Sequence, residues 1–261
     1  MATYEDILYA KANGIARITI NRPKVYNAFR TGTLLEMIDA FQDANADATV
    51  GVIVLRGAGG KAFAAGADIS AFHAERANAA QAKIYSEQGI GWMHAVAECR
   101  HPTLALIQGA CVGGGLLIAS QCDLRICNES ARFGVPVKNL GLTESYDELE
   151  GMMRVIGPAA SLEILLEGRI WGAREAYEKG LVNRVVPDDK IEEEAYATAR
   201  RIAEGAPLVA RWHKKFIRRL LDPRPLSAAE RDEGYACFDT EDYRAGVAAF
   251  LAKRKPQFSG R

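Results

Sequence analysis

The sequence predicts an α/β fold with a largely parallel sheet, followed by a helical C-terminal region. Over residues 1–186, short apolar runs suited to buried strands alternate with turns and helical segments. This alternation is typical of parallel sheets built with right-handed crossovers. From residue 187 onward only helical patterns remain, separated by prolines. We therefore expect an α/β core over residues 1–186 and a helical region over residues 187–261.

The first predicted elements are a hairpin and a helix. Two strand-like runs near the N-terminus flank Asn13-Gly14, a dipeptide that favours a tight hairpin turn. Apolar residues then recur at helical spacing over residues 34–41. Thr31 or Thr33 has the hydroxyl that a helix N-cap uses, so we expect one of them to cap this helix.

The remaining elements follow from the same two patterns. A continuous apolar run predicts a strand buried on both faces at residues 50–55. The pattern predicts a second buried strand at residues 103–107 and another strand at residues 123–127. Helical spacing predicts helices that end at residue 98 and that span residues 114–120, 189–204, 208–221, 227–238 and 240–253.

Composition bounds the function. Lys plus Arg and Asp plus Glu both total 33, so the net charge is zero and no basic field argues for a nucleic-acid partner. The apolar runs are too short to span a membrane and the first residues carry no signal-peptide pattern, so we expect a cytoplasmic protein without a membrane partner. The five cysteines and four histidines lack metal-ligand spacing, which predicts buried reduced thiols and no metal.

Two glycine-containing segments indicate acyl chemistry. One spans residues 64–69 around Gly66, and the other spans residues 107–117 around the run Gly113-Gly114-Gly115. Each has a strand-like approach, a glycine turn and residues suited to begin a helix. Glycine lets the backbone approach a ligand, and a helix start leaves N–H groups unpaired. Two such ends that converge would hold an oxyanion between two backbone donors.

Further motifs occur in a fixed order along nearly the whole chain. They are Ile20-Asn21-Arg22-Pro23-Lys24, Phe63 to Ile69, Gly109 to Gly115, Cys122-Asp123, Phe133-Gly134, and Gly172-Ala173 with Gly180-Leu181-Val182. In this order the chain resembles the crotonase (enoyl-CoA hydratase/isomerase) superfamily. The resemblance implies a spiral of β-β-α units with a C-terminal helical trimerisation region, assembled as a homotrimer or a dimer of trimers. It also implies an acyl-CoA thioester as substrate, with coenzyme A as part of that substrate and no separate cofactor.

The resemblance also implies a set of site residues. The two oxyanion donors are the backbone N–H groups of Ala67 and Gly114, reached independently by the glycine argument above. Residues implied to lie along the CoA and the ligand channel are Lys24, Val25, Ala65, Asp68, Ile69 and Ser70. Phe250, Lys253 and Lys255 either reach a CoA, in this subunit or a neighbouring one, or form a solvated C-terminus; both readings stay open.

Two expected carboxylates are missing. Hydration of an enoyl-CoA needs one group to activate water and one to deliver a proton. Family hydratases place glutamates where this chain has Leu117 and Val137, and neither side chain moves a proton. We therefore expect isomerisation, decarboxylation, hydrolysis or carbon–carbon cleavage rather than simple hydration. The alternative is a catalytically silent acyl-CoA-binding trimer.

Glu144 is the candidate for a relocated general base. It lies in a segment where other members of the superfamily place reactive groups, and apolar surroundings from Leu117 and Val137 would raise its pKa toward neutrality. Tyr146 is a candidate to hydrogen-bond the acyl group. Against this, Ser145-x-x-Glu148 has the spacing of a capping box, so Glu144 is alternatively a solvated acid at a helix start.

Overall fold

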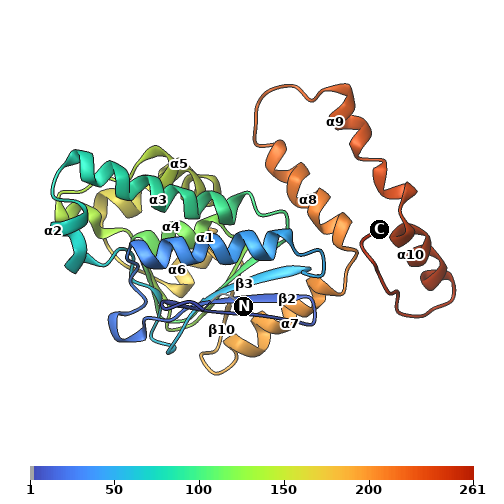
Figure 1. Ribbon diagram of the computed structural model, residues 1–261, viewed down its shortest axis with the longest axis horizontal. Coiled ribbons are helices and arrows are strands. Elements are labelled where there is room, and N and C mark those ends of the chain that lie inside the picture. Colours follow the sequence, from blue (N-terminus) through green and yellow to red (C-terminus); the bar gives the residue numbers. More distant parts are fainter. Residues whose placement is uncertain (1–2) are drawn as a thin grey trace.

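A computed structural model describes residues 3–261, apart from the side chain of His73. Its core contains two sheets (Figure 1). The larger sheet has the order β1-β2-β3-β5-β7-β10, with bounds β1 Ile7–Ala12, β2 Ile15–Ile20, β3 Val52–Gly57, β5 Thr103–Ile107, β7 Leu124–Asn128 and β10 Arg184–Val186. The smaller sheet has the order β4-β6-β8-β9, with bounds β4 Ala62–Ala64, β6 Ala110–Val112, β8 Arg132–Gly134 and β9 Trp171–Gly172. Among residues 3–261, β1 in the larger sheet and β9 in the smaller one pair antiparallel and the other strands pair parallel, so the predicted largely parallel sheet is confirmed.

Successive strands alternate between the two sheets before each helix. β3 leads to β4 and then to α2 and α3; β5 leads to β6 and α4; β7 leads to β8 and α5. This repeat is the predicted spiral of β-β-α units. The helices are α1 Thr31–Ala46, α2 Phe72–Glu75, α3 Ala79–Ala97, α4 Gly114–Gln121, α5 Tyr146–Glu167, α6 Ala173–Glu178, α7 Ile191–Ala203, α8 Pro207–Arg219, α9 Ala228–Glu233 and α10 Glu241–Leu251. Short 3-10 turns include η1 Pro23–Val25, η2 Ile69–Ala71, η3 Pro136–Leu140 and η4 Ala236–Asp239.

The larger sheet is covered on both faces, which explains the unbroken apolar runs of its strands. In β3, Ile53 and Leu55 face the main core, which also contains residues of α1, α3 and α4. Their neighbours Val52 and Val54 face a second cluster, in which α7 packs against the sheet. Helix α7 thus belongs to the packed core, although it follows Val186, where the last strand ends.

The predicted hairpin is confirmed, and so are several element bounds. Asn13 and Gly14 have φ values of 53° and 75°, the left-handed conformation that a two-residue hairpin turn requires. The strand predicted at residues 103–107 coincides with β5, and the helix predicted at residues 114–120 ends one residue short of α4. The helix predicted at residues 227–238 is instead divided between α9 and η4.

The predicted cap of α1 is wrong. Arg30 is the N-cap, and Thr31 is the first helical residue. Thr33 lies inside the first turn, where its Oγ1 accepts a hydrogen bond from the Arg30 backbone N–H at 3.2 Å. The same hydroxyl donates to Asp6 Oδ2 at 2.5 Å, and Asp6 also accepts from Arg30 Nε. This cluster, in which Asp6 and Thr33 are buried just before β1 and in the first turn of α1, fixes the start of the helix.

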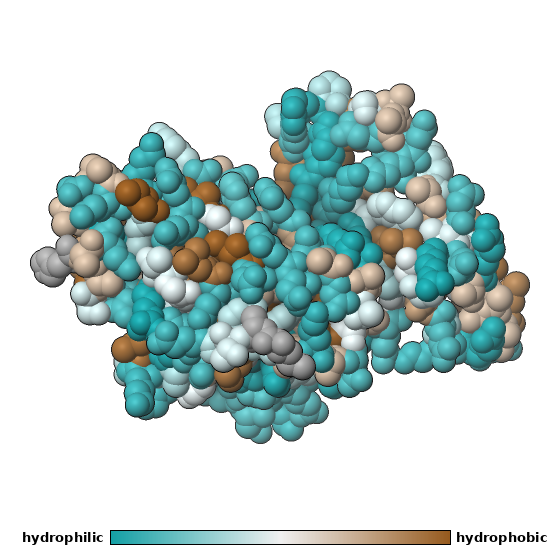
Figure 2. All heavy atoms as spheres, viewed as in Figure 1, coloured by the Kyte–Doolittle hydropathy of each residue, from teal (hydrophilic) through white to brown (hydrophobic). Residues whose placement is uncertain are grey.

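Helices α8, α9 and α10 form an arm that extends away from the core (Figure 1). A notch separates core and arm in the space-filling view, and hydrophobic atoms gather at the outer end of the arm (Figure 2). Large apolar side chains of the arm that are more than half exposed are Ile217, Leu220, Leu221, Tyr235, Phe238, Phe250 and Leu251. Over the described residues, no helix has the length and apolar character needed to cross a membrane.

Candidate active site

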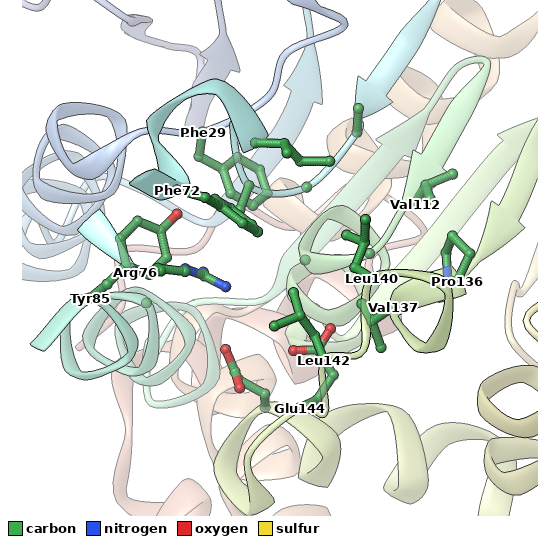
Figure 3. A pocket seen from close by; sticks show the side chains of 18 of the residues that line it. Phe29, Phe72, Arg76, Tyr85, Val112, Pro136, Val137, Leu140, Leu142 and Glu144 are labelled. Atoms are coloured by element: carbon green, nitrogen blue, oxygen red, sulfur yellow. The ribbon is translucent and has the colours of Figure 1, made fainter. Parts of the chain in front are cut away.

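A cavity of about 340 Å³ lies between the turn after β4, the start of α4, helix α3 and the segment from η3 to α5 (Figure 3). Its walls are mostly apolar. They include Phe29, Leu34, Phe72, Trp92, Met93, Val112, Val137, Leu140 and Leu142. Three charged side chains also line it: Arg76, Glu144 and Glu148. The cavity therefore combines mostly apolar walls with a few ionisable side chains, as small-molecule binding sites do.

Two glycine turns meet at one wall of this cavity. Gly66 has φ +92° and Gly113 has φ +55°, conformations that side chains disfavour. A Cβ added to Gly66 would lie 3.0 Å from the backbone nitrogen of Gly114 and 3.1 Å from the carbonyl oxygen of Val112. The parallel pairing of β4 with β6 brings the two turns side by side. Glycine at position 66 is thus required by both conformation and contact.

The backbone amides of Ala67 and Gly114 are unpaired beside this contact. On either side of Ala67, Phe29 N–H donates to the Gly66 carbonyl at 2.8 Å and Asp68 N–H donates to the Phe29 carbonyl at 2.8 Å. This extended pairing with Phe29 leaves the intervening Ala67 N–H on the opposite side. Gly114 is the first residue of α4, so its N–H has no acceptor within the helix. Across residues 3–261 neither amide meets an acceptor, and both residues line the cavity.

Asp68 and Ser70 hold the first turn in place and do not line the cavity. Asp68 accepts from Ser70 N–H at 3.2 Å and from Ser70 Oγ at 2.6 Å, and its other oxygen accepts from Arg22 at 3.1 Å. The bonds from Ser70 and then the Arg22 charge keep the pKa of Asp68 below its ordinary value, against the effect of burial. Of the residues implied to lie along the channel, Ala65 and Ile69 do line the cavity.

Five other predicted residues have different outcomes. Lys24 and Val25 lie exposed on η1, outside the cavity lining, and their place beside an adenine stays a prediction. Val137 lines the cavity. Leu117 is 1 % exposed and packs into the main core instead, because its side chain leaves α4 on the buried face. Tyr146 is 95 % exposed and does not line the cavity, because it projects outward from the first turn of α5.

Glu144 lines the cavity just before α5, and Figure 3 shows its carboxylate turned toward the open space below Arg76. Within the described chain, this carboxylate accepts no hydrogen bond. Burial raises the pKa of Glu144 from an ordinary 4.5 to about 7, repulsion by Glu148 adds to the rise, and Arg76 opposes it. Glu144 is therefore an acid that carries and loses a proton near neutrality.

The predicted capping box is confirmed, and it involves Glu148 rather than Glu144. Ser145 is the N-cap of α5, and Glu148 Oε2 accepts from both the backbone N–H and the Oγ of Ser145 at 2.7 Å. Glu148 thus secures the helix start while it lines the cavity. The capping task does not use the Glu144 carboxylate, which stays available for chemistry.

The sequence did not identify Arg76 or Glu148 as site residues. Arg76 follows the four-residue helix α2, and nothing in its neighbourhood in the sequence marks it as a cavity residue. Glu148 had only a capping signature. No three His, Cys, Asp or Glu side chains gather into a metal-binding group in the part of the chain that is described.

Comparison with known families matches this geometry to one group of proteins. The profile of the family described as enoyl-CoA hydratase/isomerase matches residues 10–261. The chain belongs to this family. A probable enoyl-CoA hydratase of Mycobacterium tuberculosis is 36 % identical over 261 residues, covering 99 % of this chain and 100 % of the relative. A crotonyl-CoA hydratase of Syntrophomonas wolfei is 34 % identical, covering 98 % of both chains.

Solved structures of enoyl-CoA hydratase/isomerase proteins share the fold. The crystal structure of an enoyl-CoA hydratase/carnithine racemase from Magnetospirillum magneticum superposes with a TM-score of 0.98 at 50 % identity, covering 99 % of this chain and 97 % of that one. An enoyl-CoA hydratase from Bacillus anthracis superposes with a TM-score of 0.92 at 30 % identity, covering 98 % of this chain and 100 % of that one. The resemblance noted from the motifs is confirmed.

Proposed function

We propose that this protein is an enzyme that binds an acyl-CoA thioester and forms its enolate. In this proposal the N–H groups of Ala67 and Gly114 donate to the thioester oxygen. The observation that carries it is the pair of unpaired amides beside the Gly66–Gly114 contact, both on the cavity wall. Such preorganised donors stabilise the charge that develops on the oxygen, and removing one costs about 10²–10³ in rate in enzymes. Relatives named as enoyl-CoA and crotonyl-CoA hydratases support the substrate class.

Glu144 is the proton carrier in this proposal. The hydratase positions hold Leu117 and Val137, which cannot carry a proton. Of the two glutamates in the described lining, Glu148 is engaged by Ser145, and Glu144 accepts no hydrogen bond from the described residues. With a pKa of about 7, the ionised carboxylate of Glu144 removes a proton from the α- or γ-carbon of an enoyl thioester, and the resulting carboxylic acid returns it to the other carbon. This double-bond isomerisation needs a single acid–base group, whereas hydration needs two roles. We therefore propose isomerisation as the reaction.

The experiment follows exchange of α-protons in heavy water. Butyryl-CoA cannot be hydrated or isomerised, but an enzyme that forms its enolate replaces its α-protons with deuterium, which mass spectrometry detects. We expect exchange with the wild-type protein and a loss of at least about 100-fold in Glu144→Gln. Tyr146→Phe, a change of an exposed neighbour, serves as the control and should retain the wild-type rate.

The same experiment distinguishes this proposal from the alternative of a catalytically silent protein. A silent acyl-CoA-binding protein would bind butyryl-CoA without exchange, and would leave 2-enoyl and 3-enoyl thioesters unchanged. Isomerisation is tested directly by interconversion of those two thioesters, followed by chromatography. Hydration of the 2-enoyl thioester, with no isomerisation, would contradict the assignment of a single proton carrier.

We also propose that the arm mediates assembly into a homotrimer or a dimer of trimers. Its apolar side chains are too extensively exposed for an isolated subunit; Phe250 is 83 % and Leu251 is 76 % exposed. Lys255 Nζ forms an ion pair with Glu204 Oε2 of the same chain at 2.8 Å. Native mass spectrometry is expected to give about three or six times 28.4 kDa. A monomer at micromolar concentration would contradict the proposal.

A further inference from the structure

Arg76 places a fixed positive charge in the cavity. Its guanidinium carbon lies 3.8 Å from the centroid of the Tyr85 ring and 4.7 Å from that of Phe72. Cation–π contacts with two rings hold a guanidinium in one orientation while they leave its edge free for hydrogen bonds. In Figure 3 the end of the side chain reaches into the open space of the cavity, on the side opposite Val112 and Pro136.

The guanidinium has no acidic partner in the described chain. No carboxylate oxygen of those residues lies within 4.0 Å of it. Its Nε is buried without an acceptor. Buried polar groups nearly always have a partner, so an unpaired arginine on an apolar wall indicates a place for an external acceptor.

The neighbouring acids do not supply that acceptor. Glu75 accepts a hydrogen bond from Thr31 Oγ1 at 3.0 Å. Glu148 is held by the Ser145 cap. Glu144 is protonated over much of the range below pH 7, because burial raises its pKa to about 7. The Arg76 guanidinium thus faces the cavity without a carboxylate of the described chain paired to it.

We propose that Arg76 binds a second carboxylate at the far end of the acyl chain, so that the preferred substrates are thioesters of CoA with a dicarboxylic acid. This inference rests on the proposed function. A planar guanidinium pairs with a carboxylate through two parallel hydrogen bonds. The apolar wall formed by Leu140 and Leu142 suits the methylene groups between the two ends. A CoA phosphate is the other possible anion, but Lys24 and Val25, implied to lie beside the adenine, are outside this cavity.

The test compares affinities within matched pairs of thioesters by calorimetry. Glutaryl-CoA is paired with butyryl-CoA and adipyl-CoA with pentanoyl-CoA, so that each pair differs by one carboxylate; free CoA is measured alongside. With the wild-type protein we expect at least one dicarboxylic member to bind about tenfold more tightly than its partner. In Arg76→Gln that ratio should fall to within twofold of one. In the control Arg174→Gln, which removes a charge from a side chain that is 92 % exposed on α6, the wild-type ratio should persist.

Several results would overturn the inference. Wild-type ratios within twofold of one for both pairs would do so while leaving the proposed function standing, provided that the monocarboxylic thioesters bind. An equal loss for CoA and all four thioesters in Arg76→Gln would assign Arg76 to a CoA phosphate. An equal fall in the affinity ratio in Arg76→Gln and Arg174→Gln would assign the preference for dicarboxylic thioesters to the overall charge of the protein. Failure of every thioester to bind the wild-type protein would overturn the proposed function as well.

Discussion

Replacing Glu144 with glutamine should stabilise the protein at neutral and higher pH, but not at acidic pH. The ordinary pKa of this carboxyl is 4.5, and burial with repulsion by Glu148 raises it to about 7 in the folded chain. The fold therefore prefers the neutral carboxyl. Its favourable contribution is complete below pH 4.5, where both states carry the proton, and is lost as the pH rises through about 7. Above that pH the folded chain holds a poorly solvated charge, which glutamine does not introduce.

The magnitude follows from the two pKa values. A difference of about 2.5 in pKa, at 1.36 kcal/mol for each pH unit, gives about 3 kcal/mol as an upper figure. Relative to the wild-type protein, Glu144→Gln should thus gain up to about 3 kcal/mol in free energy of unfolding at pH 8 and close to nothing at pH 4.5. Since the Glu144 side chain is half-buried, solvent reduces this gain rather than enlarging it.

Urea unfolding at pH 4.5, 6, 7 and 8 measures this difference. All samples should have the same protein concentration, because association of subunits contributes to the apparent stability. Tyr146→Phe is the control, and its effect should be the same at each pH. A Glu144→Gln variant that is no more stable than the wild-type protein at pH 8, or that shifts stability equally at every pH, would refute the assignment of Glu144 as an acid with a raised pKa.

Three further outcomes are expected. Gly66→Ala, which places a Cβ 3.0 Å from Gly114 N at a φ of +92°, should lower α-proton exchange by about 100-fold or more; exchange within twofold of the wild-type rate would contradict the two-amide site. Asp68→Asn should lower the free energy of unfolding at pH 7 by about 1 kcal/mol, because the stabilisation from Ser70 and Arg22 exists above pH 3.8 and is lost as the pH falls below it; an equal loss at pH 3 would argue against it. The wild-type exchange rate should rise with pH to a plateau above about 7 as Glu144 ionises, and a flat profile would exclude it as the base.

Features that depend on local sequence could be predicted. The Asn13-Gly14 turn, the fully buried strand β5 and the glycine run that opens α4 each follow from one conformational preference of a few adjacent residues. The positions of Ala67 and Gly114 on one cavity wall were predictable for the same reason, since neighbouring parallel strands present their ends at one edge.

Features that depend on side-chain direction could not be predicted. Leu117 was expected beside the substrate and lies in the core, and Tyr146 was expected in the site and faces outward. The direction of a side chain on a helix depends on its position along the helix, and packing against the rest of the fold decides which face of the helix is buried. Arg76 enters the cavity because the rings of Phe72 and Tyr85 hold it there, and those rings come from two different helices.

A crystal structure with butyryl-CoA bound would test the two-amide site most directly. The account predicts the thioester oxygen within about 3.2 Å of both the Ala67 and the Gly114 nitrogen, with the acyl chain directed toward Glu144. A thioester oxygen that contacts neither nitrogen, or a chain that lies outside the cavity, would contradict it.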